Sequence, residues 1–324
     1  MQRRMELYGL LATLFAMTCA GLATLGLGGI IDDRLDILNH LQPLYLAGGA
    51  GALLLQIPVP APRNRLALAC ASLAVAVSAL LIGPELATRW TQRSARAGGQ
   101  TLKVVQMNSW GENKTPRATA AWLIGQNADV VVLEEILPPT TVQIPALVAQ
   151  TYPYRTPMRA PFDCSTFILS KTRPAAWGAW PSYDTVGRHS GVWARFGHGP
   201  SAYTVVGVHN LWPFPAGRQQ AQTGLLASRL DAFDRAGLIL TGDFNSTPWS
   251  FSLRRQDALL GLERRSRALF TFPVQLYSHY KLWTPLPLLA IDHIYAGSSW
   301  RTVSVMRGPN LGSSHLPVVA VLTR

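Results

Sequence analysis

Asp243 and Asn245 are the residues whose types and spacing most directly suggest chemistry. They follow the apolar run at residues 238–240, with Gly242 beside them and a turn at Pro248 after them. Because side chains alternate between the two faces of a strand, residues two positions apart point the same way. An acid and an amide directed at one place suit a site that holds a hard cation, a phosphate and a water molecule.

Two further apolar runs end in the same kinds of side chain. Residues 104–107 lead to Asn108, and residues 130–133 lead to Glu134 and Glu135. Short apolar runs bounded by turn residues are typical of buried strands. We therefore expect acidic and amide side chains to be delivered at the ends of several strands.

Two histidines and one more acid complete the set. His209 ends the run at residues 203–208, Asp292 lies in the run at residues 291–295, and His315 precedes the last apolar run. Phosphodiester hydrolysis needs a cation for the phosphate, donors for its oxygens and a base that activates water. Each side chain taken singly also fits an ordinary core or surface position, whereas the whole set can supply all three needs.

The ordered set of segments resembles the endonuclease/exonuclease/phosphatase family of metal-dependent phosphodiesterases, which includes DNase I-like nucleases, neutral sphingomyelinases and inositol phosphatases. The resemblance covers roughly residues 100–324, with the motifs in the family's order. It implies an α/β (α+β) fold, a four-layered α/β sandwich with two mixed β-sheets. It also implies a hydrolase that acts on phosphoric ester bonds with Mg²⁺, or with Mn²⁺ in its place.

The resemblance also assigns roles to single residues. Glu135 matches the family's metal-binding glutamate, and Asn108 lies near the same cation. His209 resembles the histidine that donates to the scissile phosphate. Asp243 and Asn245 match the pair that orients the attacking water and the phosphate.

The proton-transfer residues follow from the same resemblance. His315 resembles the general base, and Asp292 the acid that fixes its tautomer. Relatives usually have an aspartate where this chain has Ser314, and often a glutamine where it has Glu134. The missing aspartate predicts weaker metal binding, a replacement by another acid such as Glu134, or a domain that binds without catalysis.

The elements that must position these residues begin after residue 100. Short apolar runs separated by turn signals outnumber the helical stretches, which we expect at residues 116–127 and 218–236. This texture favours mixed sheets packed face to face with helices outside. Strands are predicted at residues 102–107, 130–133, 166–169, 192–196, 203–208, 238–240, 291–295 and 318–322.

The N-terminal part of the chain has the composition of a membrane region. Its first apolar run is uncharged over 23 positions, which is long enough to cross a bilayer and longer than the core of a cleaved signal peptide. We expect a membrane region at residues 1–84 with about three transmembrane helices at residues 8–30, 38–57 and 66–83, a linker at residues 85–100 and a catalytic domain at residues 101–324.

Flanking charges predict the orientation of this region. Arg3 and Arg4 precede the first span, residues 32–36 are mostly acidic, and Arg63 and Arg65 follow the second span. Basic loops stay inside, so the catalytic domain is expected outside. With the resemblance, this predicts a multi-pass protein of the cell inner (cytoplasmic) membrane whose catalytic domain faces the periplasm, although the arginines after the third span argue the other way.

The charge of the catalytic part does not identify a substrate. From residue 101 onward there are 17 arginines and 4 lysines against 12 acids, which suits a polyanion such as nucleic acid or an anionic lipid headgroup and equally suits general solubility in a basic proteome. Nucleic acid suits this charge, whereas a phospholipid or sphingomyelin headgroup suits a domain anchored to a lipid bilayer. The aromatic residues at 212–215 either shape a loop or offer a stacking platform. A membrane-tethered module that binds phosphate ligands without turnover is the alternative of another class, and no protein partner is inferred.

Overall fold

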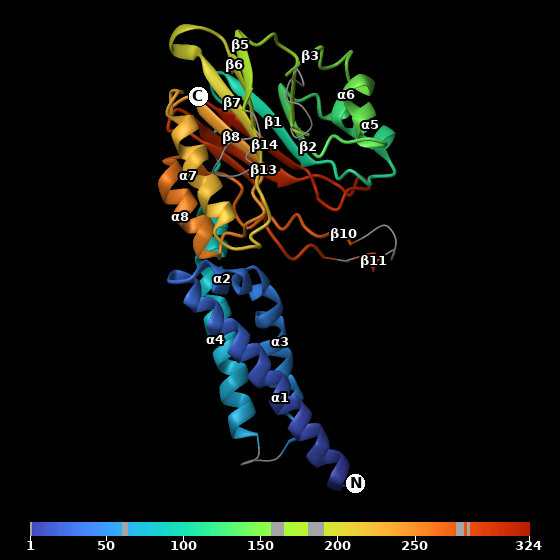
Figure 1. Ribbon diagram of the computed structural model, residues 1–324, viewed down its shortest axis with the longest axis vertical. Coiled ribbons are helices and arrows are strands. Elements are labelled where there is room, and N and C mark those ends of the chain that lie inside the picture. The colour runs from blue at the N-terminus through green and yellow to red at the C-terminus, as the bar shows by residue number, and fades with distance from the viewer. Residues whose placement is uncertain (1, 60–63, 157–164, 181–190, 277–281, 284–285) are drawn as a thin grey trace. The chain divides into compact units, whose positions relative to one another are not determined.

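The computed structural model describes residues 2–59, 64–156, 165–180, 191–276, 282–283 and 286–324 (Figure 1). The chain forms two compact units. One comprises Met1–Thr91 together with Ser246–Arg254, and the other comprises Gln92–Asn245 together with Arg255–Arg324. The short segment Ser246–Arg254 thus belongs with the N-terminal helices, although it is remote from them in sequence.

Three helices dominate the first unit: α1 (Gln2–Gly26), α3 (Gln42–Leu55) and α4 (Arg65–Thr91). Alanines meet between them, which lets the helix backbones approach closely. Two helical stretches, Gln2–Ile30 and Arg65–Thr91, are long and apolar enough to cross a membrane. The predicted middle span corresponds to α3, which at 14 residues is shorter than the roughly 20 residues of a typical transmembrane helix.

Short elements connect α1 to α3. They are the turn of 3₁₀ helix η1 (Leu27–Ile30), the helix α2 (Asp33–Asp36) and a second 3₁₀ turn, η2 (Ile37–Leu41). Asp32 begins α2 by accepting a hydrogen bond from the backbone N–H of Arg34 at 2.9 Å. This connection also carries polar side chains that are buried, among them Asp36, Asn39 and His40.

Two six-stranded mixed sheets make up the second unit. The strand order is β13-β14-β1-β2-β4-β3 in the first sheet and β5-β6-β7-β8-β12-β9 in the second. In each sheet a parallel pair, β1 with β2 or β7 with β8, is flanked by antiparallel strands. The strands of the first sheet are β1 (Thr101–Asn108), β2 (Val130–Glu134), β3 (Tyr154–Arg155), β4 (Phe167–Ser170), β13 (Arg301–Arg307) and β14 (Val318–Thr323). Those of the second are β5 (Ala176–Trp180), β6 (Gly191–Phe196), β7 (Tyr203–His209), β8 (Leu238–Asp243), β9 (Glu263–Arg264) and β12 (Asp292–Ala296).

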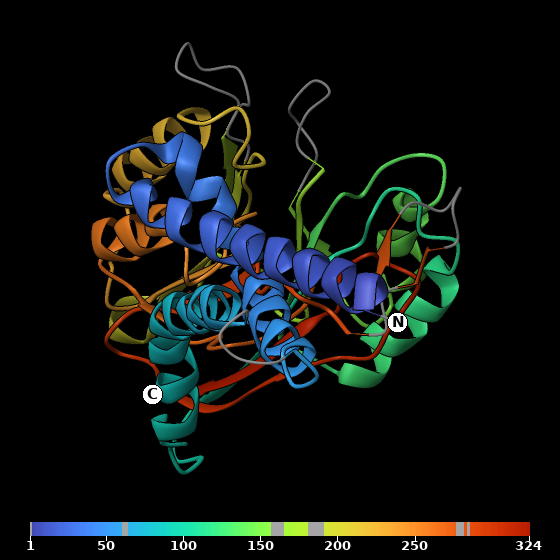
Figure 2. The ribbon, with the colours of Figure 1, turned by 90° about the horizontal axis from the view of Figure 1, so that it is seen from below.

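The main core lies between the two sheets. Apolar side chains from both sheets, such as Val104, Val132, Val205 and Ile239, form one buried cluster. A second cluster joins the first sheet to α5 (Pro116–Gln126) and to α6 (Ile144–Leu147). Helices α7 (Arg218–Leu230) and α8 (Phe251–Leu260) lie on the other side of the sheets from α5 and α6 (Figures 1 and 2). The predicted four-layered sandwich with two mixed sheets is therefore confirmed.

The predicted elements correspond closely to those of the structure. Each of the eight predicted strands matches a strand, and the helix expected at residues 116–127 is α5. The helix expected at residues 218–236 is α7, which ends earlier, at Leu230. The helices α6 and α8 were not predicted, nor were the strands β3, β5, β9, β10 (Gln275–Leu276), β11 (Leu282–Trp283) and β13.

Candidate active site

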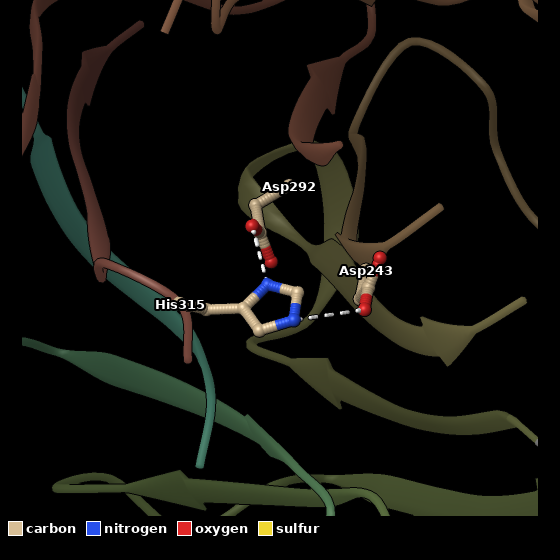
Figure 3. Close-up of side chains that lie close together, drawn as sticks. All are labelled: Asp243, Asp292 and His315. Atoms are coloured by element: carbon tan, nitrogen blue, oxygen red, sulfur yellow. Dashed lines mark hydrogen bonds and ion pairs between the residues drawn. The ribbon is translucent and has the colours of Figure 1, made fainter. Parts of the chain in front are cut away.

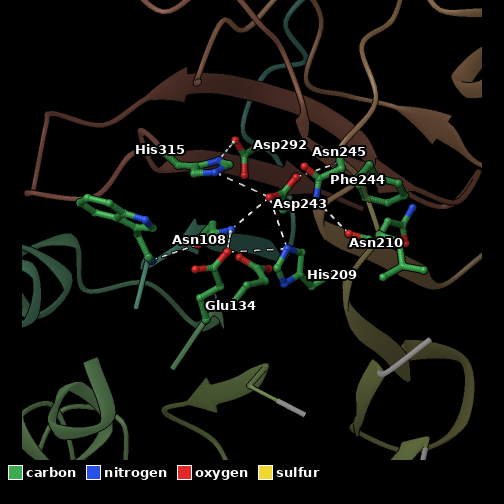
Figure 4. A network of polar contacts seen from close by, with 12 residues as sticks. Asn108, Glu134, His209, Asn210, Asp243, Phe244, Asn245, Asp292 and His315 are labelled. Atoms are coloured by element: carbon green, nitrogen blue, oxygen red, sulfur yellow. Dashed lines mark hydrogen bonds and ion pairs between the residues drawn. The ribbon is translucent and has the colours of Figure 1, made fainter. Parts of the chain in front are cut away.

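The two parallel strand pairs bring the polar residues of the sequence to one edge of the sandwich. Asn108 ends β1 opposite Glu134 at the end of β2, and His209 ends β7 opposite Asp243 at the end of β8. The carboxyl ends of parallel neighbours meet at the same edge of a sheet, and the two sheets face each other across the core. The side chains consequently form one polar network (Figure 4).

Asn108 joins the two sheets at the centre of this network. Its Nδ2 donates to Glu135 Oε1 at 3.0 Å and to Asp243 Oδ2 at 3.0 Å. Its Oδ1 accepts a hydrogen bond from the backbone N–H of Trp110 at 2.9 Å. One buried amide thus holds a carboxylate from each sheet at the same place.

His209 lies close to the same two acids. Its Nε2 lies 3.6 Å from Asp243 Oδ2 and 3.9 Å from Glu135 Oε1. The side chains of His209 and Glu135 are 22% and 26% exposed, whereas that of Asp243 is 1% exposed. His209 and Glu135 are therefore the members of this group that a ligand can reach from solvent.

His315 and Asp292 form a second pair beside Asp243 (Figure 3). His315 Nδ1 is 2.9 Å from Asp292 Oδ2, and its Nε2 lies 3.7 Å from Asp243 Oδ2. The carboxylate accepts the Nδ1–H of the ring, so Nε2 is left to accept a proton on the side of Asp243. This is the arrangement of imidazole and carboxylate that a general base with an orienting acid requires.

Charges around this pair shift its pKa values in opposite directions. Burial lowers the pKa of His315, but the charges of Asp292 and Asp243 and the hydrogen bond that the ring donates to Asp292 outweigh it and raise that pKa to about 9. Burial raises the pKa of Asp292, yet the charge of His315 and hydrogen bonds from His315 and Thr271 bring it below its usual value. For Asp243, burial raises the pKa despite the opposing charge of His315.

Two residues that the sequence did not single out hold Asp292 in place. Thr271 Oγ1 donates to Asp292 Oδ2 at 2.5 Å, and Gln106 Nε2 donates to Asp292 Oδ1 at 2.9 Å. Gln106 could have been found, because it is a polar residue inside the apolar run that becomes β1. Nothing in the sequence around Thr271 marks it.

Glu134 lies behind the site. It is fully buried, and its Oε2 accepts the second hydrogen bond of Gln106 Nε2 at 2.9 Å. Burial and the nearby charge of Asp292 raise the pKa of Glu134 well above its usual value. Among the described residues that line the active-site cavity Glu134 is not found, whereas Glu135 is.

Backbone conformation aims the residues on the cavity side. Trp110, Glu135 and Asn245 have φ values of 54°, 54° and 50°, in the left-handed region that non-glycine residues rarely adopt. The Asn245 N–H donates to Asp243 Oδ1 at 2.8 Å, and its Nδ2 donates to the carbonyl oxygen of Asn210 at 2.9 Å. Such strained positions cluster where the surrounding structure fixes a functional side chain.

Several of the residues described above line one cavity of about 200 Å³. Three aromatic side chains form part of its wall, and the Phe272 ring lies 4.7 Å from the His315 ring and 6.2 Å from the Trp212 ring. The lining residues are Trp110, Glu112, Glu135, His209, Trp212, Asp243, Asn245, Phe272, Ser314 and His315. The cavity therefore combines an acid–imidazole side with an aromatic side.

The donor set suits a hard divalent cation. Glu135 offers a partly exposed carboxylate, and Asp243 places a second oxygen beside it through their shared bond to Asn108. The Asn108 oxygen, by contrast, is engaged by the Trp110 N–H, so the amide would have to turn to offer its oxygen to an ion. Asp243, Asp292 and His315 also place ligand atoms within 4.8 Å of one another. Two of those three are already hydrogen-bonded as an acid–imidazole pair, so we favour Glu135 as the metal ligand.

Ser314 lines the cavity and has an uncharged hydroxyl side chain. Its carbonyl oxygen accepts a hydrogen bond from the Val274 N–H at 2.8 Å, and the neighbouring Ser313 Oγ donates to the Asn108 carbonyl oxygen at 2.7 Å. The segment is thus held firmly against β1. The resemblance in sequence predicts a carboxylate at this position, where Ser314 has a hydroxyl.

Comparison with known proteins gives a consistent result. The model of the Endonuclease/Exonuclease/phosphatase family matches residues 105–315. No curated protein matched the sequence. Among solved structures, sphingomyelinase C from Streptomyces griseocarneus is similar with a TM-score of 0.52 and 20% identity, covering 69% of this chain and 100% of its own.

Two other solved structures show the same fold. A mutant of beta toxin from Staphylococcus aureus with bound magnesium ions has a TM-score of 0.51 and 15% identity, over 69% of this chain and 100% of its own. The human nocturnin catalytic domain with a bound sulfate anion has a TM-score of 0.55 and 15% identity, over 72% of this chain and 98% of its own.

Proposed function

Because the chain belongs to the Endonuclease/Exonuclease/phosphatase family, whose enzymes hydrolyse phosphoric esters, we propose that it is a membrane-anchored, Mg²⁺-dependent phosphodiesterase. Water is the nucleophile, and His315 is the general base. The observation that carries this proposal is the His315–Asp292 pair, whose other ring nitrogen, Nε2, faces Asp243 in the same cavity as Glu135.

Proton transfer is assigned to His315. The Asp292 carboxylate holds Nδ1–H, so Nε2 can take the proton of a water molecule bound by Asp243, 3.7 Å away. Asp292 then stabilises the imidazolium that forms. Thr271 and Gln106 keep the Asp292 carboxylate in the orientation that this requires.

The remaining residues bind the phosphate and the cation. His209, partly exposed beside Glu135, would donate to a phosphate oxygen, and Asn245 would help to orient the phosphate and the water. Glu135 and Asn108 would hold Mg²⁺, or Mn²⁺ in its place. When bound, the cation neutralises charge on the phosphate. With Ser314 in the cavity wall and Glu134 behind it, we expect the ion to be held weakly.

A phosphodiester of nucleic acid is the first candidate substrate, since the catalytic part of the chain is strongly basic. The cavity wall favours a second candidate, a phospholipid or sphingomyelin headgroup. Three aromatic residues line the cavity together with two acids, and aromatic faces with acids suit a quaternary ammonium group; they are Trp110, Trp212 and Phe272 with Glu112 and Glu135. The fold neighbour sphingomyelinase C is consistent with this candidate.

Anchoring in a bilayer is proposed from the two long apolar helices, Gln2–Ile30 and Arg65–Thr91. The flanking charges support a multi-pass protein of the inner membrane with its catalytic domain on the periplasmic side. A site held close to a bilayer would meet lipid headgroups at high local concentration.

The test is turnover by the full chain in detergent. With Mg²⁺ or Mn²⁺ we expect hydrolysis of DNA, RNA, sphingomyelin or a chromogenic diester that EDTA abolishes. His315→Ala should lower kcat by about 10²–10⁴-fold, because it removes the general base. The matched control His198→Ala, at an exposed position away from the cavity, should leave the rate unchanged.

Two outcomes would count against this assignment. Full activity of His315→Ala would exclude His315 as the base. Binding of phosphate ligands without turnover of any substrate, with either ion, would instead support the non-catalytic module that the sequence left open.

A further inference from the structure

We propose that Asp36 and His40 of the N-terminal helical unit are positioning residues for the active site. They fix the segment Ser246–Arg254, which continues directly from Asp243 and Asn245. The inference rests on the proposed function, because it assigns a task to residues of that same site.

Asp36 supplies hydrogen-bond acceptors to the start of α8. Its Oδ1 accepts from the Phe251 N–H at 2.8 Å and its Oδ2 accepts from the Ser252 N–H at 2.7 Å. The first N–H groups of a helix have no partner within the helix. Ser250 Oγ accepts from the Leu253 N–H at 3.2 Å, so the local sequence caps only the next of these groups. Asn39 Nδ2 in turn donates to Asp36 Oδ1 at 2.8 Å and fixes the carboxylate.

His40 holds the part of the segment closest to the active site. Its Nδ1 accepts from the Thr247 N–H at 3.3 Å and lies 3.0 Å from Thr247 Oγ1. The His40 carbonyl oxygen also accepts from Trp249 Nε1 at 3.4 Å. All these groups are buried, and Thr247 and Trp249 have no exposed surface. A buried N–H that loses its acceptor is destabilised, so the segment cannot rearrange freely.

The covalent chain carries this constraint to the catalytic groups. Asn245 precedes Ser246, and its left-handed backbone, with φ of 50°, directs its N–H to Asp243 Oδ1. A shift at Ser246 or Thr247 changes the backbone angles available to Asn245 and thereby the position of both side chains. Misplacement of a reacting group by about 1 Å can cost on the order of 10²-fold in rate.

The kinetic test uses Asp36→Asn in the full chain, with Asp32→Asn as the matched control. Both remove one carboxylate charge from the same connection, but Asp32 is exposed, and its carboxylate accepts a hydrogen bond from the nearby Arg34 N–H instead of from the start of α8. We expect kcat to fall roughly 10–100-fold in Asp36→Asn, with KM and the half-saturating Mg²⁺ concentration unchanged. Glu135 and Asn108, which would hold the ion, lie outside the segment. A fall in kcat no greater than in Asp32→Asn would overturn the proposal.

A double-mutant cycle separates positioning from a merely structural role. If Asp36 acts through Asn245, Asp36→Asn should lower kcat only slightly in the Asn245→Ala background, so the two effects on kcat would not add. Equal fold-changes in both backgrounds would contradict the proposal.

Hydrogen exchange of the full chain tests the same link without turnover. In Asp36→Asn the amides of Phe251 and Ser252 should exchange faster, and so should that of Asn245, with no change there in Asp32→Asn. Faster exchange at Phe251 and Ser252 with unchanged exchange at Asn245 would overturn the proposal, even if the fold is intact. Absence of turnover in the unaltered protein would count against the proposed function, while this readout would still decide the link.

Discussion

The protonation of His315 sets the pH dependence of the proposed reaction. As a general base it must be neutral, but Asp292 and Asp243 outweigh burial and raise its pKa to about 9. The protonated, inactive form is therefore favoured below that pH. We expect kcat/KM to rise with pH along an acidic limb that belongs to His315.

Replacement of Asp292 by asparagine should move this limb. The variant loses the negative charge that contributes most to the raised pKa, so the pKa of His315 falls and the limb shifts to lower pH. The maximum value of kcat/KM, reached above the limb, should also fall by about 10²–10⁴-fold, because the ring loses its orienting acid. A pH–rate profile measures both changes, with Asp231→Asn, an exposed acid of the same unit, as control. A limb that stays in place would show that another group titrates.

Ser314 lies where the resemblance in sequence predicts an aspartate. Ser314→Asp adds a carboxylate to the cavity wall beside Glu135 and should lower the half-saturating Mg²⁺ concentration by roughly 10–100-fold. Ser314→Asn, of similar size without the charge, is the control. An equal effect of both changes would mean that charge at this position does not matter, and metal-dependent turnover measures the difference.

Most of the candidate site could be predicted from the sequence because its residues end apolar runs. Asn108, His209 and Asp243 end strands whose pairing brings them together. Gln106 and Thr271 could not be assigned to Asp292 in this way. Their partner lies 186 and 21 positions away, so the hydrogen bonds exist only once the sheets have packed.

Among the elements, β8 depends on a glycine to pair with β7. Gly242 has φ of 153°, and a Cβ atom there would lie 1.8 Å from the carbonyl oxygen of Val208, its neighbour on β7. Backbone atoms of a central strand cannot move aside without breaking the pairing. The same close approach brings Asp243 level with His209.

Gly242→Ala should therefore lower the free energy of unfolding by at least about 2 kcal/mol, through overpacking and a strained φ. Thermal unfolding of the full chain in detergent measures the change. Gly224→Ala, in α7 with open space around the added atom, should be neutral or slightly stabilising, since alanine favours helices. Similar melting temperatures for both variants would contradict this account of the β7–β8 pair.

The predictable elements are those with strong apolar patterns. Strand β5 was missed because its Ala and Trp residues are at most half-buried at the edge of the second sheet. Strand β13 also lies at a sheet edge, and a register shift between Thr302 and Ser304 interrupts its alternation. Edge strands receive less burial than central ones, so their sequences carry a weaker signal.

At the scale of the whole molecule, the sequence predicted a helical region followed by a strand-rich one. The membership of Ser246–Arg254 in the helical unit could not be predicted. It depends on side chains more than 200 positions away, Asp36 and His40, whose bonds leave no local pattern. Local signals describe elements, whereas this grouping is a property of the folded chain.

The placement of Ser246–Arg254 limits how parts of this protein could be exchanged by recombination during evolution. An N-terminal unit joined only through a linker can be exchanged during evolution without loss of the catalytic part. Here the segment after Asn245 contributes to the folding of the N-terminal unit, and Trp249 is entirely buried with it. A recombination event at Thr91 would separate Asp36 from the helix start that it caps. The N-terminal unit and the catalytic part are thus expected to pass between lineages together.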